Sequence, residues 1–212
     1  EKEVYAALWH QTYFPGYLMK FDADTGVEQV RYVHPRPLRH VPFEVADLDE
    51  DAAKEILVGA HRNAFGDAVL IVFDSRRIQG HAPVQGSYAV RGLSPARHEA
   101  YVRFPTTKVD AESQLLHPFV RDVEVNARTG RFTAQVQDGR VAEEAGRRRS
   151  YVLVTFTSDF EPVNVGTSSW YDRLAQRLVQ EGRLDAVPGP EDFRWYREQI
   201  RFWMGEGGRA RP

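Results

Sequence analysis

The sequence predicts a single α+β domain with a mostly antiparallel sheet. Several segments alternate apolar and polar residues, and one continuous apolar run is typical of a strand covered on both faces. Other segments carry apolar residues at helical spacing. The chain has 212 residues and no cysteine, and this length buries a core without disulfides or cysteine zinc sites. We expect the domain to span residues 1–204, followed by a flexible tail at residues 205–212.

The first forty residues are predicted to be β structure. Residues 17–22 and 27–34 flank a turn that contains a glycine and are expected to pair as strands. Residues 4–14 are rich in aromatic side chains and fit either a strand or a short helix. Residues 41–46 are predicted to form a short strand at a sheet edge, because Pro42 has no N–H to donate to a neighbouring strand.

A helix is expected over residues 49–65. Apolar residues recur there at helical spacing, behind a run of acids that the positive end of a helix dipole would favour. Residues 68–73 form the longest apolar run and are predicted to be a buried strand. With the preceding strand, this helix and strand would form one βαβ unit at residues 41–74. An αβ pair on an antiparallel sheet fits the same pattern.

The second half of the chain returns to alternating strands and then to helices. A short helix is expected at residues 94–104, because a serine–proline pair suits an N-cap and first helical position. Residues 119–137 alternate clearly and are predicted to form a hairpin, with a third strand of the same meander at residues 151–157. Two C-terminal helices are expected, at residues 169–181 and 191–204.

Composition and motifs exclude several classes of protein. No apolar run approaches the roughly 20 residues of a membrane helix, and no secretory signal is visible, so we expect a cytoplasmic protein without membrane contact. A net charge of −2 provides no general attraction to nucleic acid. The sequence contains no dinucleotide-binding, P-loop, serine-elbow, zincin or EF-hand motif, so it identifies neither a cofactor nor a metal.

Only four of the 28 basic residues are lysines, so arginine greatly outnumbers lysine. Codon bias in a GC-rich genome explains such a ratio. Recognition of carboxylate or phosphate by the planar guanidinium is the functional explanation. The arginines that bear on function gather in two loops and in the last predicted helix.

The first of these loops follows the buried strand and spans residues 74–86. Polar groups beyond the end of a buried strand are a common location for sites in α/β folds. Asp74 would orient His81 as a catalytic base, while Arg76 and Arg77 would clamp an anion. In the alternative interpretation Asp74 caps the turn, and the two arginines are solvated or paired with surface acids.

The second loop spans residues 34–40 and is stiffened by two prolines. It carries His34 and His40 as candidate catalytic groups and Arg36 and Arg39 as candidate anion ligands. The spacing of the two histidines matches no metal signature. An ordinary surface loop explains the same composition.

The last predicted helix carries apolar residues on two sides. Trp195 and Phe202 form a ridge roughly opposite its main apolar face, with arginines between the two faces. Aromatic and arginine side chains are typical of protein interfaces, so this ridge is a candidate contact for a homo-oligomer or another protein. Burial on both sides is the structural alternative, and single-stranded nucleic acid is the least favoured partner.

These observations lead to two functional hypotheses. The preferred one is an enzyme or enzyme-like pocket protein that acts on a small anionic molecule. His81, or His34 and His40, would serve as acid or base, the loop arginines would hold the anion, and the two loops would face one pocket. The alternative is a non-catalytic interaction protein that uses its C-terminal helix.

Overall fold

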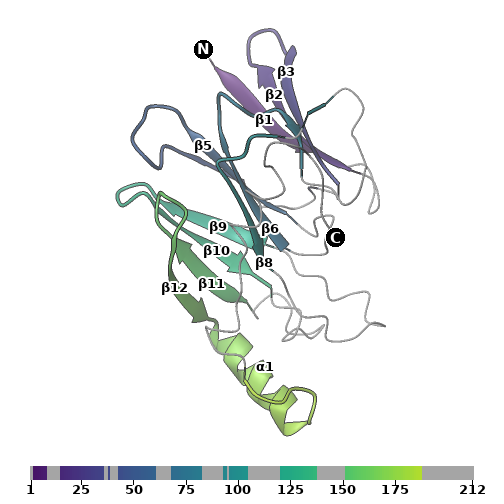
Figure 1. The fold of residues 1–212 in the computed structure, drawn as a ribbon, viewed down its shortest axis with the longest axis vertical. Helices are drawn as coiled ribbons and strands as arrows, with labels where there is room; N and C mark the ends of the chain where they lie inside the picture. Colours follow the sequence, from purple (N-terminus) through teal and green to yellow (C-terminus); the bar gives the residue numbers. More distant parts are fainter. Residues whose placement is uncertain are drawn as a thin grey trace.

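The computed structural model contains three four-stranded sheets and one helix within the residues it describes (Figure 1). All pairs of neighbouring strands are antiparallel except β3 and β7. The described residues are 2–8, 15–35, 38, 43–60, 68–82, 93–94, 96–104, 120–137 and 151–187.

The N-terminal sheet has the strand order β1-β2-β3-β7. Its strands are β1 (Glu3–Leu8), β2 (Gly16–Asp22), β3 (Glu28–His34) and β7 (Gly80–His81). The predicted pairing around the glycine turn is confirmed, and Gly26 has the positive φ (70°) that the turn requires. The ambiguous aromatic segment forms strand β1 over its first part, while residues 9–14 lie outside the described residues.

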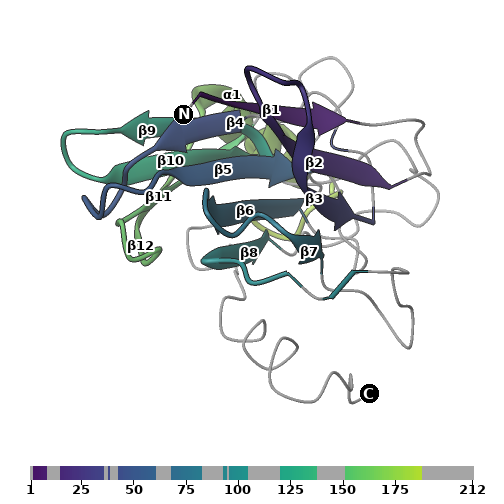
Figure 2. The same ribbon diagram turned by 90° about the horizontal axis from the view of Figure 1, so that it is seen from above.

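The central sheet has the order β4-β5-β6-β8, and its strands lie side by side in Figure 2. They are β4 (Phe43–Ala46), β5 (Glu55–Ala60), β6 (Ala68–Asp74) and β8 (Ala100–Phe104). Every residue of β5, β6 and β8 is buried, and β6 confirms the buried strand predicted at residues 68–73. Leu57 and Leu70 belong to one apolar core, whereas Ile56 and Ile71 belong to the other.

The C-terminal sheet is a meander with the order β12-β11-β10-β9. Its strands are β9 (Val120–Asn126), β10 (Arg131–Val136), β11 (Val152–Phe156) and β12 (Pro162–Thr167). The predicted hairpin and the third strand are confirmed, and β12 is an additional edge strand. This sheet shares one apolar core with the central sheet, and the N-terminal sheet shares the second. The central sheet therefore lies between the other two.

The prediction of a helix at residues 49–65 is wrong, and so is the βαβ unit at residues 41–74. Residues 55–60 form β5, which pairs antiparallel with both β4 and β6. The preceding segment bends with positive φ at Glu50 (62°) and Ala52 (68°), which a right-handed helix does not permit. The acids that suggested a helix N-terminus instead accept hydrogen bonds from the backbone of this bend.

The helix predicted at residues 94–104 is also wrong, because residues 100–104 form β8. The side chains of this segment are buried on both faces of the central sheet, with Tyr101 in one core and Val102 in the other. A helix would place such neighbouring side chains about 100° apart and not on opposite faces.

The described part of the chain contains one C-terminal helix instead of two. Helix α1 (Ser169–Gln180) confirms the first prediction, and the second, at residues 191–204, lies outside the described residues. The side chain of Ser168 caps α1 by accepting from the N–H of Tyr171 at 3.1 Å. Tyr171 and Leu174 pack into the core shared with the C-terminal sheet.

The described residues include no helix with the length and hydropathy of a membrane span. The division into a domain at residues 1–204 and a tail at 205–212 stays a prediction, since residues 188–212 lie outside the described part.

Candidate functional site

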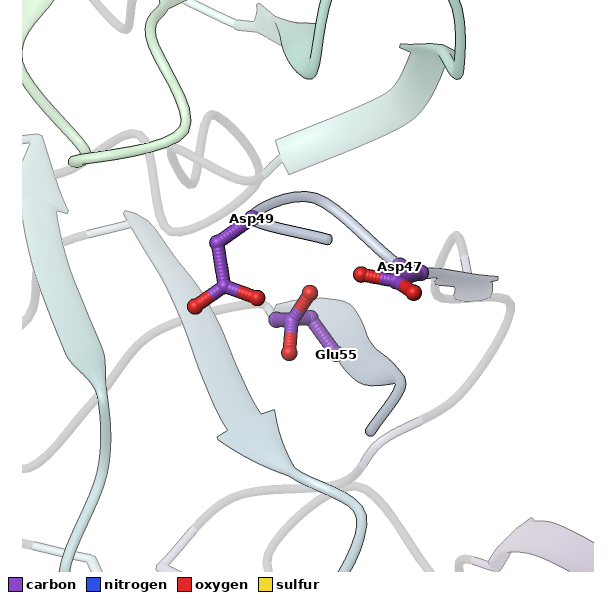
Figure 3. Close-up of side chains that lie close together, drawn as sticks. All are labelled: Asp47, Asp49 and Glu55. Atoms are coloured by element: carbon purple, nitrogen blue, oxygen red, sulfur yellow. The ribbon is translucent and has the colours of Figure 1, made fainter. Parts of the chain in front are cut away.

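Three carboxylates converge where β4 turns into β5. Asp47 directly follows β4, Asp49 lies in the connecting bend, and Glu55 is the first residue of β5. One carboxylate oxygen from each lies within 4.8 Å of the others. Figure 3 shows the three side chains pointing toward one another.

The bend between the two strands brings these side chains together. Asp49 accepts a hydrogen bond from the N–H of Asp51 at 3.1 Å, and Asp51 accepts one from the N–H of Ala53 at 2.8 Å. These local bonds satisfy backbone groups that neither a helix nor a sheet pairs. The chain thereby reverses direction within a few residues, so residues at the end of β4 face the start of β5.

Glu55 is the buried member of the cluster. Glu55 is only 2% exposed, and its Oε2 accepts a hydrogen bond from the N–H of Leu48 at 2.6 Å. Burial raises the pKa of Glu55 to about 7, against the lowering effect of this bond, and repulsion from Glu99, Asp49 and Asp47 adds to the rise. The site therefore holds more negative charge than its surroundings compensate.

The described residues provide no ion-pair partner for this charge. Their salt bridges involve other carboxylates, and none of them reaches Asp47, Asp49 or Glu55. In addition, Oδ1 of Asp47 is buried and accepts no hydrogen bond from any described residue. Buried polar atoms are normally satisfied, so an oxygen without a partner beside two further carboxylates indicates room for a ligand.

A cleft of about 170 Å³ opens beside the cluster. Its lining residues are Leu48, Asp49, Glu55, Ser158, Asp159 and Phe160. The last three come from the turn between β11 and β12, which is closed by a hydrogen bond from Phe160 N–H to the Thr157 carbonyl at 3.0 Å. The cleft thus lies at the junction of the central and C-terminal sheets.

The tip of the β9–β10 hairpin packs against the same bend. Gly130 has φ of 62°, and a Cβ at this residue would lie 2.5 Å from the carbonyl oxygen of Leu48. Only glycine permits both this backbone conformation and this close approach. The position of the acidic bend is therefore fixed from the C-terminal sheet as well as from its own strands.

The arrangement can hold a hard cation. Its donor set consists of carboxylates, with a serine hydroxyl at the cleft and no imidazole or thiolate among the cleft's lining residues. Oxygen ligands of this kind suit Ca²⁺ or Mg²⁺, whereas Zn²⁺ prefers nitrogen and sulfur.

The residues predicted in loop 74–86 make a different set of contacts. Asp74 is 2% exposed and hydrogen-bonded to Arg76, which lowers the pKa of Asp74. Arg76 also pairs with Asp51 at 2.9 Å, and Arg77 lies 3.8 Å from Asp74. The interpretation of both arginines as partners of acids fits these contacts.

His81 uses its ring nitrogen Nδ1 to donate to the carbonyl of Ala82 at 2.8 Å. The structure thus shows Asp74 hydrogen-bonded to Arg76, and His81 hydrogen-bonded to the backbone carbonyl of Ala82. The catalytic and ligand-binding roles of these residues stay predictions.

The structure brings together one histidine from each predicted loop. His34 is completely buried at the end of β3, and Val33 beside it is paired with His81 on the parallel strand β7. The N–H of Ala82 donates to the Val33 carbonyl at 2.8 Å, so residues 80–82 inside loop 74–86 lie beside the strand end at which loop 34–40 begins. The other predicted members of loop 34–40 lie outside the described residues: Arg36, Arg39 and His40.

The predicted interface residues Trp195 and Phe202 also lie outside the described residues. Their role stays a prediction.

The sequence shows the acids of this cluster, but they were interpreted as the N-terminus of a helix. Asp47, Asp49 and Asp51 alternate with other residues, and Glu55 follows four residues later. Helical spacing in the following segment favoured a helix N-terminus. The run of acids ahead of β5 is the signal that the sequence offers at this site, but it does not by itself specify the bend.

No protein-family model matches the chain, and no curated protein matches it.

Proposed function

We propose that the chain binds a divalent cation, preferentially Ca²⁺, at Asp47, Asp49 and Glu55. The observation that carries this proposal is the buried carboxylate of Glu55, which faces two further carboxylates and has no cationic partner among the described residues. An uncompensated buried charge is costly, and a cation at the centre of the three oxygens removes that cost.

Ca²⁺ is favoured over Mg²⁺ by the form of the site. Ca²⁺ accepts six to eight oxygens in irregular geometry, whereas Mg²⁺ requires near-octahedral ligands and retains its waters. The cluster combines two carboxylates on an irregular bend with one on a strand, beside a cleft that admits water or further oxygens. Such an uneven set is more easily adapted to the larger ion.

The cleft places oxygen atoms from the β11–β12 turn of the C-terminal sheet near the ion. Ser158 and Asp159 line it together with Asp49 and Glu55. A cation held there attracts oxygens from both sides, so binding stabilises the contact between the central and C-terminal sheets. Calcium at about 100 times its Kd would add about 2.7 kcal/mol to the free energy of unfolding.

Calorimetric titration and thermal unfolding test the proposal. Wild-type protein is freed of metal with a chelator and titrated with CaCl2 or MgCl2. We expect binding of Ca²⁺, weaker binding of Mg²⁺, and a Tm that rises with the Ca²⁺ concentration. Glu55→Gln abolishes both effects, whereas the matched control Glu44→Gln, an exposed residue of β4, retains them. Equal effects in both variants contradict the proposal.

We also retain as a proposal the pocket for a small anionic molecule that the sequence predicts. The observation in its favour is the placement of His34 and His81 on the neighbouring strands β3 and β7. Phosphate titrated into wild type, His81→Ala and Arg77→Ala provides the test. Binding that is lost in both variants supports this function, and binding unchanged by either removes these residues from it.

The interaction function of the C-terminal helix stays a proposal as well. Light scattering on wild type and Trp195→Ala tests it. A dimer that dissociates in the variant supports self-association, and a wild-type monomer excludes it.

A further inference from the structure

Three of the seven histidines lie close together where the N-terminal and central sheets meet. His98 belongs to the connection between β7 and β8, in its described part at residues 96–99. Ala96 in this segment donates its N–H to the carbonyl of His81 at 2.9 Å, and Glu99 donates to that of Val72 at 3.0 Å. The segment therefore passes from the edge of one sheet to the edge of the other, with His98 at the crossing.

The imidazole of His98 contacts both sheets. Its ring centroid lies 5.4 Å from that of Tyr32 on β3, and 5.0 Å from those of Phe73 on β6 and Tyr101 on β8. Its Nε2 is hydrogen-bonded to the Tyr32 hydroxyl at 3.2 Å. Its Nδ1 is buried and has no hydrogen-bond partner among the residues that the structure describes. Three aromatic rings and one hydroxyl thus hold the imidazole between the sheets.

Protonation of His98 conflicts with this environment. An imidazolium carries a charge and two N–H donors, and one of these donors would face the buried surroundings of Nδ1 without an acceptor. Such a group is costly to bury. The neutral ring, in contrast, needs only the hydrogen bond that Tyr32 provides.

The titratable groups that face His98 offer no compensating anion within the described residues. They are Tyr32 and His34 from β3, His81 from β7 and Tyr101 from β8, while β6 contributes the uncharged Phe73. Burial, and with it repulsion from His34 and His81, lowers the pKa of His98 from 6.5 to about 3.

We propose that His98 makes the contact between the N-terminal and central sheets sensitive to acid. The neutral imidazole joins the sheets, and uptake of one proton favours the form in which they separate. The contact is at full strength above the ordinary pKa of 6.5 and weakens as the pH falls toward about 3. Within this window the population of the separated form rises about tenfold per pH unit, which is about 30-fold at pH 5.

Hydrogen exchange of the full chain at pH 7 and pH 5, corrected for intrinsic rates, tests this device. We expect the protection of β1, β2 and β3 to fall about 30-fold between these pH values. The C-terminal sheet serves as the internal control, and β9, β10 and β11 keep their protection. In His98→Phe, which retains an aromatic ring between the sheets, the selective loss disappears. A loss that is equal in all three sheets, or that persists in His98→Phe, overturns the proposal.

A second measurement on the wild type keeps the test decisive if the variant does not fold. The imidazole resonance of His98 is followed by NMR from pH 7 to pH 5 in the folded protein. A resonance that keeps its neutral chemical shift throughout supports the proposal. A titration midpoint near 6.5 in the folded state contradicts it.

Discussion

Replacement of Glu55 by glutamine is the most informative single change. In the metal-free protein the pKa of this buried carboxyl is raised to about 7. Unfolding restores an ordinary value of 4.5, so ionisation destabilises the folded state as the pH rises from about 4.5 to 7, and the full cost is present above pH 7. The difference of 2.5 units corresponds to about 3 kcal/mol.

Glutamine retains the shape of the side chain and an oxygen that accepts from the N–H of Leu48. Its amide N–H groups also donate hydrogen bonds to the carboxylates of Asp47 and Asp49. The carboxylate of Glu55, in contrast, repels these two groups. We therefore expect Glu55→Gln in a chelator to be more stable than wild type by about 1–3 kcal/mol at pH 8. Near pH 4.5 the difference should shrink to about 0.4 kcal/mol, because the carboxyl is then protonated in the folded wild type and half protonated in the unfolded chain.

Urea unfolding at pH 8 and pH 4.5, followed by tryptophan fluorescence, measures this difference. Glu44→Gln is the matched control and should change the free energy of unfolding by less than about 0.5 kcal/mol at either pH. A Glu55→Gln protein that is less stable than wild type at pH 8 refutes the reasoning, because the carboxylate would then be compensated in the metal-free state.

Three further substitutions test how the site and its supports are built. Gly130→Ala places a Cβ 2.5 Å from the Leu48 carbonyl at a positive φ and should cost about 1–3 kcal/mol in urea unfolding. Ser168→Ala removes the N-cap of α1 and should cost about 1 kcal/mol, with a loss of helical circular dichroism on heating. Arg76→Ala removes the closest charged partner of the buried Asp74 and leaves only Arg77, at 3.8 Å, so it should lower the free energy of unfolding at pH 7. This loss should shrink at low pH, where Asp74 is protonated, and a loss that is independent of pH contradicts the assigned ion pair.

Local patterns were sufficient to predict the strands that alternate or that are apolar throughout. Strand β10 alternates over its whole length, β9 alternates from Val123 onward, and the first residues of β6 form an uninterrupted apolar run. In both cases the residues of the strand itself carry the information, because the faces of a strand follow directly from its period of two.

The two wrong helices show where local patterns fail. In β5 the apolar residues Ile56, Leu57 and Ala60 are spaced as on one side of a helix. The same residues suit a strand when a second sheet covers its other face. That second sheet is built from residues far away in the sequence, so tertiary packing decided between two structures that the pattern allowed.

The acidic site was visible in composition but not in geometry. Convergence of the three carboxylates depends on Glu50 and Ala52, two residues other than glycine with positive φ. Residue preferences argue against such conformations, so the bend could not be predicted from the sequence. Strain of this kind is concentrated at functional sites, which agrees with a ligand at this bend.

Titration of the metal-free protein with Ca²⁺ by calorimetry is the most direct test of the central claim. The account predicts one saturable site in the wild type and in Glu44→Gln, and its loss in Glu55→Gln. Absence of binding in the wild type, or binding that survives in Glu55→Gln, contradicts the assignment of the acidic bend as a cation site.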